Sequence, residues 1–435
     1  MSFNIIQTTV LRDNCIGCGT CDAICPVDIL KMDFNSIGMY EPIESEGCLD
    51  KCTLCMDACP FVEENQDEKE LGKKLYENEN NMLFHKDLGY FVNTYEVYKK
   101  ETSERLKSAS GGAGHSILKN LLEQKLVDTI LTVESNDDPD KLFKFSNFKE
   151  VQELEKIRSS VYYPTEMSEV LDYVMKNDGT YAITTLPCFA KAIRLAQGKN
   201  SKLRKRIKFV IGLVCGQMKT KEFTHTLAKN AIGTDRLKSV NYRVKQDTEP
   251  ASNFAFGFQD IKDGSVGRLS LTAQFDGPGK LWGSRAFTPN ACNSCTDVFA
   301  HCADIVLMDA WLPNYMKDYR GHSLVIARKN EISEILEKSL DIEVKEIEYE
   351  KVFLSQKPVV DNKNAIFYGS KNIFTQLINK QKLKIQKLSN ENYEKNKPEI
   401  DLLFNKIRQI QKIYSLVMLP KRVVLKIFRI LKGSR

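Results

Sequence analysis

Several features that often reveal a protein's class are missing from this chain of 435 residues. No run of about 18 consecutive apolar residues occurs, so we expect no membrane-spanning helix. The first 11 residues lack the basic segment and the long apolar segment of a secretory signal, which favours the reducing cytoplasm. Neither a G-x-G-x-x-G sequence nor a Walker sequence is present, so these two nucleotide-binding loops are excluded.

Excess charge is also missing from most of the chain. The formal net charge of +6 arises near the C-terminus, where residues 401–435 hold nine Lys or Arg side chains and only Asp401 as an acid. The first 400 residues carry 54 basic and 56 acidic side chains. Because nucleic-acid-binding domains are usually strongly basic, we expect no nucleic-acid partner for this near-neutral body.

Cysteine, in contrast, is plentiful: there are 13, and eight of them form two runs near the N-terminus. The first run, Cys15 to Pro26, has the C-x2-C-x2-C-x3-C-P spacing of bacterial ferredoxins, and the second, Cys48 to Pro60, is one residue longer. In such pairs, three thiols of one run and the last thiol of the other hold each 4Fe-4S cluster. We therefore predict two clusters, one held by Cys15, Cys18, Cys21 and Cys59 and the other by Cys48, Cys52, Cys55 and Cys25.

A zinc ribbon and a disulfide framework are the alternatives for these eight cysteines. Zinc sites usually use two C-x2-C pairs rather than two runs of four thiols, and disulfides are rare in the cytoplasm. We therefore expect a compact iron-sulfur module over residues 1–62, with short strands at 8–11 and between 32 and 42, where Gly38 makes a turn.

Beyond this module, the pattern predicts a domain of mixed strands and helices. β-Branched runs indicate strands, helical spacing of apolar residues indicates helices, and alternating aromatic residues over 239–275 indicate an antiparallel insert. The strands are expected at 128–133, 181–185, 209–214 and 323–327, and the helices at 115–125, 167–176, 189–196 and 221–230. The expected class is α+β or α/β, with a solvated helix or polar linker at 63–84, the mixed domain at 85–350 and a helical, basic region at 351–435.

Four cysteines of the mixed domain form a second candidate metal site. Cys188 and Cys215 follow predicted strands, while Cys292 and Cys295 form a C-x2-C pair on a predicted loop. Spacing alone leaves two interpretations equally open, because these thiols could converge on zinc or a cluster, or could be ordinary buried thiols. Cys302 is left over, and we expect it to be packed in a helix.

A segment of small residues, Ser108 to His115, precedes an apolar helical run. Free backbone N–H groups at the start of a helix suit a phosphate or the pyrophosphate of a flavin. Ser and Gly at the start of a helix more often form an ordinary cap and turn, so the segment is a weak indicator on its own.

Taken together, these segments resemble the beta subunits of hydrogenases and dehydrogenases that use the deazaflavin coenzyme F420. The matching segments occur in the family's order, and the family includes members with a fused two-cluster ferredoxin module. They are Ser110–Gly112, 185–188, 211–216 and the stretch from Cys292 to Trp311, and the resemblance covers roughly residues 1–350. Met308 and Gly216 depart from it, because the family usually has glycine and histidine there.

The resemblance implies a flavin-dependent iron-sulfur oxidoreductase. FAD would contact Ser110, Gly111 and Gly112, and a third 4Fe-4S cluster beside it would be held by Cys188, Cys215, Cys292 and Cys295. A flavin exchanges hydride with a substrate, whereas each cluster carries single electrons, so the pair connects two-electron to one-electron chemistry. The implied partner is a redox protein such as ferredoxin or a partner subunit.

Two alternatives remain open. The chain could be a non-catalytic electron-transfer subunit of a larger complex, or a reductase linked to surface polysaccharide biosynthesis. His115, Arg158, Tyr162 and Tyr163 lie in segments expected to border the flavin, and none of them is assigned as a proton donor.

The C-terminal region has two apolar helical faces on either side of Pro420. Their members are Leu403, Ile407, Ile410, Tyr414 and Val417, followed by Val424, Ile427, Phe428 and Leu431. A basic amphipathic helix can lie on an anionic membrane surface, so peripheral contact with the inner face of the membrane is one expectation. A helix docked on its own domain or on a partner subunit is the other.

Overall fold

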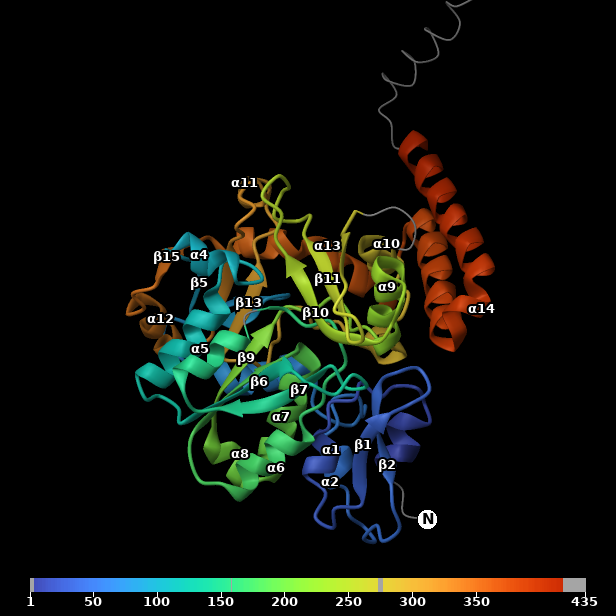
Figure 1. Ribbon diagram of the computed structural model, residues 1–435. Helices are drawn as coiled ribbons and strands as arrows, with labels where there is room; N and C mark the ends of the chain where they lie inside the picture. Colours follow the sequence, from blue (N-terminus) through green and yellow to red (C-terminus); the bar gives the residue numbers. More distant parts are fainter. Residues whose placement is uncertain (1–3, 158, 273–276, 418–435) are drawn as a thin grey trace, which may run out of the picture.

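An eight-stranded mixed sheet forms the centre of the protein (Figure 1). The computed structural model describes residues 4–157, 159–272 and 277–417. In sheet order the strands are β15 (Ile342–Glu346), β5 (Asn93–Lys99), β14 (Ser323–Ala327), β13 (Ile305–Asp309), β9 (Ile207–Leu213), β8 (Tyr181–Thr185), β6 (Thr129–Ser135) and β7 (Phe143–Phe148). The four strands β13, β9, β8 and β6 run parallel, and the outer pairs are antiparallel. The predicted mixed α/β class is confirmed, including the four predicted strands.

Helices cover both faces of this sheet. On one face, α5 (Ala113–Glu123) and α12 (Asn330–Glu337) pack on Phe209 and Ile211 of β9. On the other face, α6 (Ser168–Lys176), α7 (Pro187–Lys199) and α8 (Ser201–Arg206) pack on Val210. Because successive side chains of a strand point to opposite faces, a strand buried on both sides has the continuous β-branched runs seen in the sequence.

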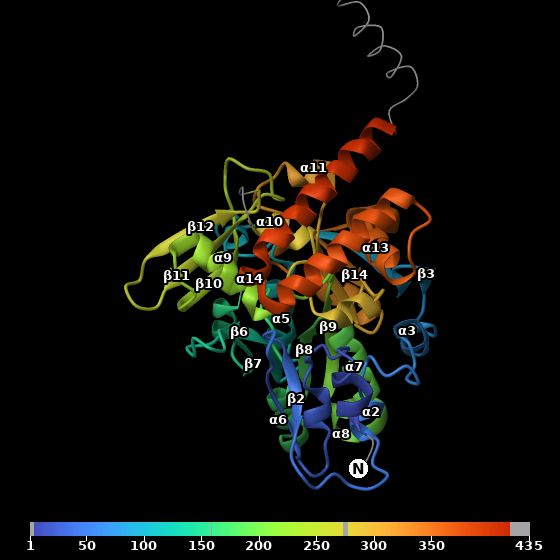
Figure 2. The same ribbon diagram turned by 90° about the vertical axis from the view of Figure 1, so that its right-hand side faces the viewer.

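The N-terminal module packs against the α6 and α7 side of the domain (Figures 1 and 2). Its elements are η1 (Ile6–Val10), α1 (Thr20–Ala23), β1 (Leu30–Phe34), β2 (Tyr40–Glu44) and α2 (Leu54–Asp57). The backbone N–H of Met167 donates to the carbonyl of Cys18 at 3.0 Å, and Lys199 pairs with Asp57 at 3.0 Å. The module and the domain therefore share one interface that includes a cysteine of the first run.

The hairpin predicted around Gly38 is confirmed, because β1 and β2 pair antiparallel there. The strand predicted at 8–11 is wrong. This segment is helical: the N–H of Thr8 donates to the carbonyl of Asn4, and the N–H of Leu11 donates to that of Ile6. These local bonds satisfy the backbone without a partner strand and override the β propensity of Thr8–Val10.

The solvated helix or polar linker expected at 63–84 contains a helix in the structure, but one face of this helix is buried. Helix α3 (Glu68–Tyr76) is capped by Asp67, whose side chain accepts from the N–H groups of Lys69 and Glu70. Its inner face is buried, and the hydroxyl of Tyr76 donates to the carbonyl of Cys302 at 3.2 Å. The short hairpin of β3 (Leu83–His85) and β4 (Gly89–Phe91) follows. Composition suggested solvent exposure, but one well-placed leucine and one tyrosine suffice to dock the helix.

The predicted antiparallel insert is confirmed as a three-stranded sheet of β10 (Leu237–Val244), β11 (Ala255–Asp260) and β12 (Val266–Ser270). It packs with α9 (Lys221–Ile232) and α10 (Pro278–Gly283) around an aromatic core that includes Tyr242, Phe256 and Phe287. The remaining short elements are α4 (Thr102–Leu106), η2 (Val151–Lys156), η3 (Asn290–Ser294) and α11 (Pro313–Met316).

Two helices end the described chain, α13 (Tyr349–Phe367) and α14 (Ile373–Val417), and α14 kinks at Asn392 (Figure 2). Leu403 and Ile407, two of the residues considered for membrane contact, are buried in the aromatic core of the insert. The second apolar face, which contains Val424, Ile427, Phe428 and Leu431, lies outside the described residues. Within residues 4–417, apart from 158 and 273–276, no helix is both long and apolar enough to cross a membrane.

Candidate functional site

The two N-terminal cysteine runs form two groups of thiols. Burial raises the pKa of Cys21 well above its ordinary value, and the thiols of Cys18, Cys15, Cys59 and, least of all, Cys55 raise it further. The thiols of Cys18 and Cys59 also raise the pKa of Cys15, so Cys15, Cys18, Cys21 and Cys59 lie near one another. The other group lines one small cavity at the surface end of the module, and it comprises Cys25, Cys48, Cys52 and Cys55. The structure thus brings together both interleaved sets that the spacing predicts; metal binding by them stays a prediction.

Hydrogen-bond donors already face some of these sulfur atoms. The N–H of Gly17 donates to Sγ of Cys15 at 3.4 Å, and the hydroxyl of Thr9 lies 3.7 Å from Sγ of Cys59. Cluster sulfurs commonly accept such bonds, which influence the reduction potential. Among the described residues, these two thiol groups included, no set of three or more His, Cys, Asp or Glu side chains is arranged to hold a single metal ion.

A third group of thiols forms where three parts of the sheet domain meet. Cys188 lies in the first turn of α7, Cys215 follows β9, and Cys292 and Cys295 lie in and after η3. Burial raises the pKa of Cys188, and the thiols of Cys295, Cys215 and Cys292 raise it further. The four residues that the family resemblance implies therefore lie together, although their spacing alone left this open.

Cys302 lies apart from this group. Its thiol is fully buried and donates to the carbonyl of Glu68 at 3.7 Å, with Asp297 and Arg194 nearby. The helix expected around Cys302 is wrong, because the residue lies in a turn before β13. A buried thiol in an ordinary packing position is the usual state of free cysteine.

The third group also lies next to the N-terminal module. Cys18 contributes to the raised pKa of Cys188, and Cys18 and Cys292 belong to the same buried core. In contrast, the group with Cys25 includes three half-buried cysteines at the outer end of the module. In space, the three groups thus follow one another from the surface of the module into the sheet domain.

Lys363 of α13 also belongs to the third thiol site, although the sequence did not predict it. Its side chain is 4% exposed, and Nζ donates to Sγ of Cys295 at 3.2 Å and to the carbonyl of Asp297 at 2.6 Å. The lysine and Cys295 are 68 positions apart in the chain, and Lys363 sits in a lysine-rich helix, so no local motif marks it.

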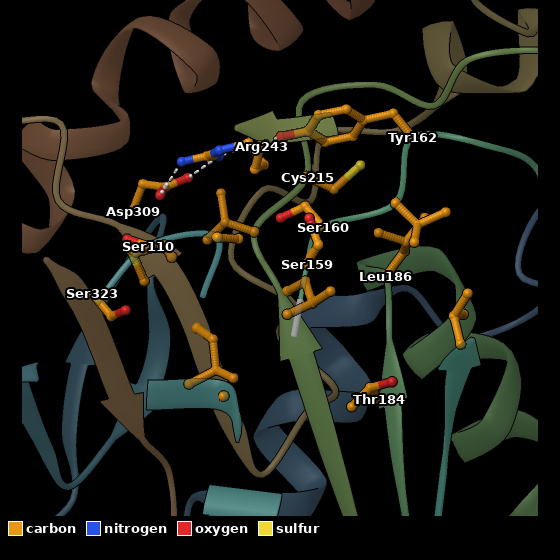
Figure 3. A pocket seen from close by; sticks show the side chains of 18 of the residues that line it. Ser110, Ser159, Ser160, Tyr162, Thr184, Leu186, Cys215, Arg243, Asp309 and Ser323 are labelled. Carbon is orange, nitrogen blue, oxygen red and sulfur yellow. Dashed lines mark hydrogen bonds and ion pairs between the residues drawn. The ribbon is translucent and has the colours of Figure 1, made fainter. Parts of the chain in front are cut away.

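A cavity of about 580 Å³ lies beside the third thiol group, and Cys215 lines it (Figure 3). Its floor is formed at the carboxyl ends of β8, β9 and β13, where Thr184, Leu186 and Asp309 are found. Strand β5 runs in the same direction as β13, because both are antiparallel to β14, so the loop after β5 reaches the same edge. In open α/β sheets this edge is where ligands usually bind, and the volume is within the usual range for cofactor sites.

The predicted flavin-binding loop borders this cavity in part. Ser110 and Gly112 line it, whereas Gly111 lies behind them, with its N–H donating to the hydroxyl of Ser323 at 3.1 Å. A Cβ at Gly111 would lie 2.5 Å from the carbonyl oxygen of Val97, so only glycine fits this close approach. Gly111 therefore positions the loop, and its neighbours face the cavity.

The ammonium of Lys99 lies beneath the same loop at the start of α5, where it pairs with Glu104 at 3.9 Å and Asp341 at 4.0 Å. Lys99 is 4% exposed, and its Nζ is 2.9 Å from Nδ1 of His115. Gly112 packs so closely on Lys99 that a Cβ would lie 2.8 Å from the lysine Cγ. A helix start with a lysine and small residues is suited to an anion such as phosphate.

Arg243 and Asp309 form an ion pair in the cavity lining, and Arg243 is buried (Figure 3). Two guanidinium nitrogens donate to the two carboxylate oxygens at 3.0 and 2.9 Å, and a longer bond of 3.4 Å reaches the hydroxyl of Tyr162. Burial favours the neutral arginine, but Asp309 and Tyr162 more than offset this and raise the pKa of Arg243. Trp311 lies 5.5 Å from the guanidinium, measured to its ring centroid.

The other residues that the sequence pattern or the family resemblance singled out lie in different places. His115, Tyr162 and Tyr163 line the cavity, as do Trp311 and Met308, so a methionine fits where the family usually has glycine. Asp304 is fully buried elsewhere, paired with Arg194 at 2.8 Å and Lys329 at 2.7 Å, which gives it a structural place. Arg158 lies outside the described residues.

Two models of one protein family match most of the sheet domain. Residues 94–172 match the N-terminal part of the coenzyme F420 hydrogenase/dehydrogenase beta subunit, and residues 178–351 match its C-terminal part. The chain belongs to this family of beta subunits. A 4Fe-4S binding domain also matches residues 8–31, which contain the first cysteine run.

The relatives of this beta-subunit-like protein are redox proteins. It is 23% identical over 320 residues to one subunit of the F(420)H(2) dehydrogenase of Methanosarcina mazei, covering 71% of this chain and 79% of the relative. It is 24% identical over 351 residues to the coenzyme F420-dependent sulfite reductase of Methanocaldococcus jannaschii, covering 77% of this chain but only 48% of that protein. These relatives support assignment to the oxidoreductases.

A solved structure shares the fold. One chain of the F420-reducing [NiFe] hydrogenase complex from Methanosarcina barkeri aligns with a TM-score of 0.50 and 17% identity, over 65% of this chain and 93% of that chain. The family match ends at residue 351, so most of α13, including Lys363, lies beyond it, and the 4Fe-4S match does not include the second cysteine run.

Proposed function

We propose that this member of the beta-subunit group is an iron-sulfur flavoprotein oxidoreductase. Electrons pass between a ferredoxin-type donor or a partner subunit, three 4Fe-4S clusters and FAD, which reduces or oxidises a substrate. One observation carries this proposal: the thiols of Cys188, Cys215, Cys292 and Cys295 gather between Cys18 of the N-terminal module and the cavity. Cys215 belongs to both the thiol group and the cavity lining.

The residues present fit three clusters. Each thiol group has four cysteines, and all 12 are free of disulfides. Backbone N–H groups donate to sulfur in the first and third groups, from Gly17 to Cys15 and from Met218 to Cys292 at 3.3 Å. The partly exposed Cys25, Cys48 and Cys52 suit an outer cluster that meets an external donor, and the buried thiols suit inner relays.

The cavity fits a flavin in three respects. Backbone and hydroxyl groups of Ser110 and its loop, above Lys99 and His115, suit a phosphate of the cofactor. Hydroxyl side chains of Ser159, Ser160 and Thr184 supply hydrogen-bond partners along the wall (Figure 3). When bound, FAD would supply hydride exchange with a substrate and single-electron exchange with the clusters.

The chain's own residues would bind and enclose this site. Aromatic side chains of Tyr162, Trp282 and Trp311 form an apolar wall that limits access of water. The Arg243–Asp309 pair fixes the end of β13 to β10 of the insert, so the cavity wall is held by a charge-assisted bidentate contact. Cys215 places a thiol at the boundary between the cavity and the third cluster site.

Rapid reduction of the bound flavin by a one-electron donor tests this function. Reduced ferredoxin is mixed with the protein under anaerobic conditions, and the loss of flavin absorbance is followed in Cys292→Ser and in the matched control Cys302→Ser. We expect Cys292→Ser to retain flavin but lose the fast phase, because Cys292 does not line the cavity. Cys302→Ser should behave as wild type. Equal rates in both variants would contradict electron transfer through the third group.

An electron-transfer subunit without its own substrate is the second candidate. It is favoured by one comparison, since the dehydrogenase relative is named as a subunit. Turnover of the isolated protein with dithionite and candidate acceptors, including the deazaflavin coenzyme, separates the two. Turnover of any acceptor supports the enzyme; a bound, reducible flavin without turnover supports the electron-transfer role.

A further inference from the structure

One face of α13 closes both the cavity and the third thiol group. Gln356 donates to the carbonyl of Asp309 at 3.0 Å, and Val359 packs against Gly216, where an added Cβ would lie 3.1 Å from the valine Cγ1. Lys363 continues the same face and contacts Cys295. Side chains three to four residues apart share one side of a helix, so this single helix spans from the cavity to the thiols.

The ammonium of Lys363 is buried, and its hydrogen-bond acceptors carry no full negative charge. Its two hydrogen bonds go to a sulfur and to a main-chain carbonyl. Among the described residues, no carboxylate lies within ion-pair distance of it; the carboxylate of Asp297, whose Oδ1 has no hydrogen-bond partner, acts on it more weakly than the thiols of Cys295, Cys215 and Cys292. A buried cation is costly unless a negative charge compensates it. Cysteine binds metal as thiolate, so an occupied third site supplies that charge.

We propose that Lys363 sets the reduction potential of the cluster held by Cys188, Cys215, Cys292 and Cys295. This inference rests on the proposed third cluster. Reduction adds one electron and neither makes nor breaks a bond, so the added negative charge must be stabilised by the surroundings. A cation hydrogen-bonded to a ligand sulfur stabilises the reduced state and makes the potential less negative.

Because α13 also contacts the cavity through Gln356 and Val359, the residue that tunes the cluster is held by the helix that borders the cofactor site. The beta-subunit match ends at residue 351, before most of this helix. Lys363 is thus a contribution of the chain's C-terminal region to the redox path.

An anaerobic redox titration followed by electron paramagnetic resonance tests this role in wild type, Lys363→Met, Lys363→Arg and Lys357→Met. Lys357 is an exposed lysine of the same helix, paired with Asp361 at its surface, so its replacement removes an equal charge. We expect one of three potentials to become more negative in Lys363→Met, and all three to keep their values in Lys363→Arg and Lys357→Met. Iron content is measured in each variant.

Unchanged potentials in Lys363→Met with about twelve irons would overturn the role of Lys363 and leave the third cluster standing. An equal shift in Lys363→Arg would also overturn it, since packing rather than charge would then be responsible. If Lys363→Met loses about four irons, the Lys363→Arg variant separates the explanations. A Lys363→Arg protein that keeps its iron content and its three potentials supports the proposal, and one that loses iron overturns it. About eight irons in wild type would instead contradict the proposed function itself.

Discussion

Cys188, in the first turn of α7, packs against the same buried core as Cys18 of the N-terminal module, and the Cys18 thiol contributes to its raised pKa. This relationship joins two cysteine groups that are far apart in the sequence, and it makes the module part of a path into the sheet domain. The N–H of Met167 donates to the carbonyl of Cys18, so the contact is fixed by the backbone at the start of α6.

Replacing Cys21 with alanine should interrupt delivery of electrons from an external donor. Cys21 lies near Cys15, Cys18 and Cys59, so its loss would remove one of the four proposed ligands of the inner cluster of the module. The flavin should stay bound, because the cavity lies in the other domain. The rate of ferredoxin-driven turnover and the flavin content of Cys21→Ala are compared with those of wild type. A turnover rate in Cys21→Ala equal to that of wild type would show that electrons enter elsewhere.

Breaking the Arg243–Asp309 pair should destabilise the protein. In Arg243→Met the carboxylate of Asp309 loses two charge-assisted bonds, and we expect a loss on the order of 3 kcal/mol, at the low end for a buried pair because Asp309 is 22% exposed. The exposed pair of Lys176 and Asp172 is the control, where Lys176→Met should cost about 0.5 kcal/mol or less. Equal shifts in unfolding temperature for both variants would rule out a special role for the cavity pair.

A methyl group at Gly111 should displace the loop that borders the cavity. The new Cβ would lie 2.5 Å from the carbonyl oxygen of Val97 and 2.7 Å from the N–H nitrogen of Ser323, and backbone atoms cannot move aside cheaply. We expect Gly111→Ala to lower both flavin content and unfolding temperature.

Gly198 of α7 is the control for this change, because a Cβ there meets no atom within 4 Å. Gly198→Ala should be neutral or slightly stabilising, by up to about 1 kcal/mol. Flavin content as high in Gly111→Ala as in Gly198→Ala would contradict the importance of this loop.

Lys245 should make stability rise with pH. Burial, with the charges of Arg243 and Arg105 nearby, lowers the pKa of Lys245 to about 7. Between this value and its ordinary pKa of 10.5 the unfolded chain binds more protons than the folded one, so stability increases as the pH rises. Below about pH 7 the free-energy cost of burying the charged Lys245 ammonium is fully present.

To test this, the unfolding temperatures of wild type and Lys245→Met are measured between about pH 6.5 and pH 10. The variant should be less stable overall, because Nζ of Lys245 donates to the carbonyls of Arg105 and Ser110 at 2.7 and 2.8 Å. Its stability should nevertheless rise less steeply with pH. An unchanged slope would place the pH dependence in another group.

How much could be predicted from sequence depended on how close the partners lie along the chain. The two N-terminal thiol groups were predicted because their cysteines have fixed local spacing, and buried strands such as β8 and β9 were predicted from their β-branched runs. The third group required the family resemblance, since Cys188 and Cys295 meet only after the sheet has formed.

Contacts made between distant segments had no sequence signal. Arg243 and Asp309 are 66 positions apart, and Lys363 and Cys295 are 68 apart, so neither pair could be recognised before the fold was known. The docking of α3 was missed for a different reason: its composition is polar, and its burial depends on Leu71 and Tyr76 alone among the large side chains.

Anaerobic measurement of iron, sulfide, zinc and flavin in the purified full-length protein tests the central claim most directly. Three clusters and one flavin predict about twelve irons, an equal amount of sulfide, one flavin and no zinc per chain. About eight irons accompanied by one zinc, or a protein without flavin, would contradict the proposed path from the N-terminal module through the third thiol group to the cavity.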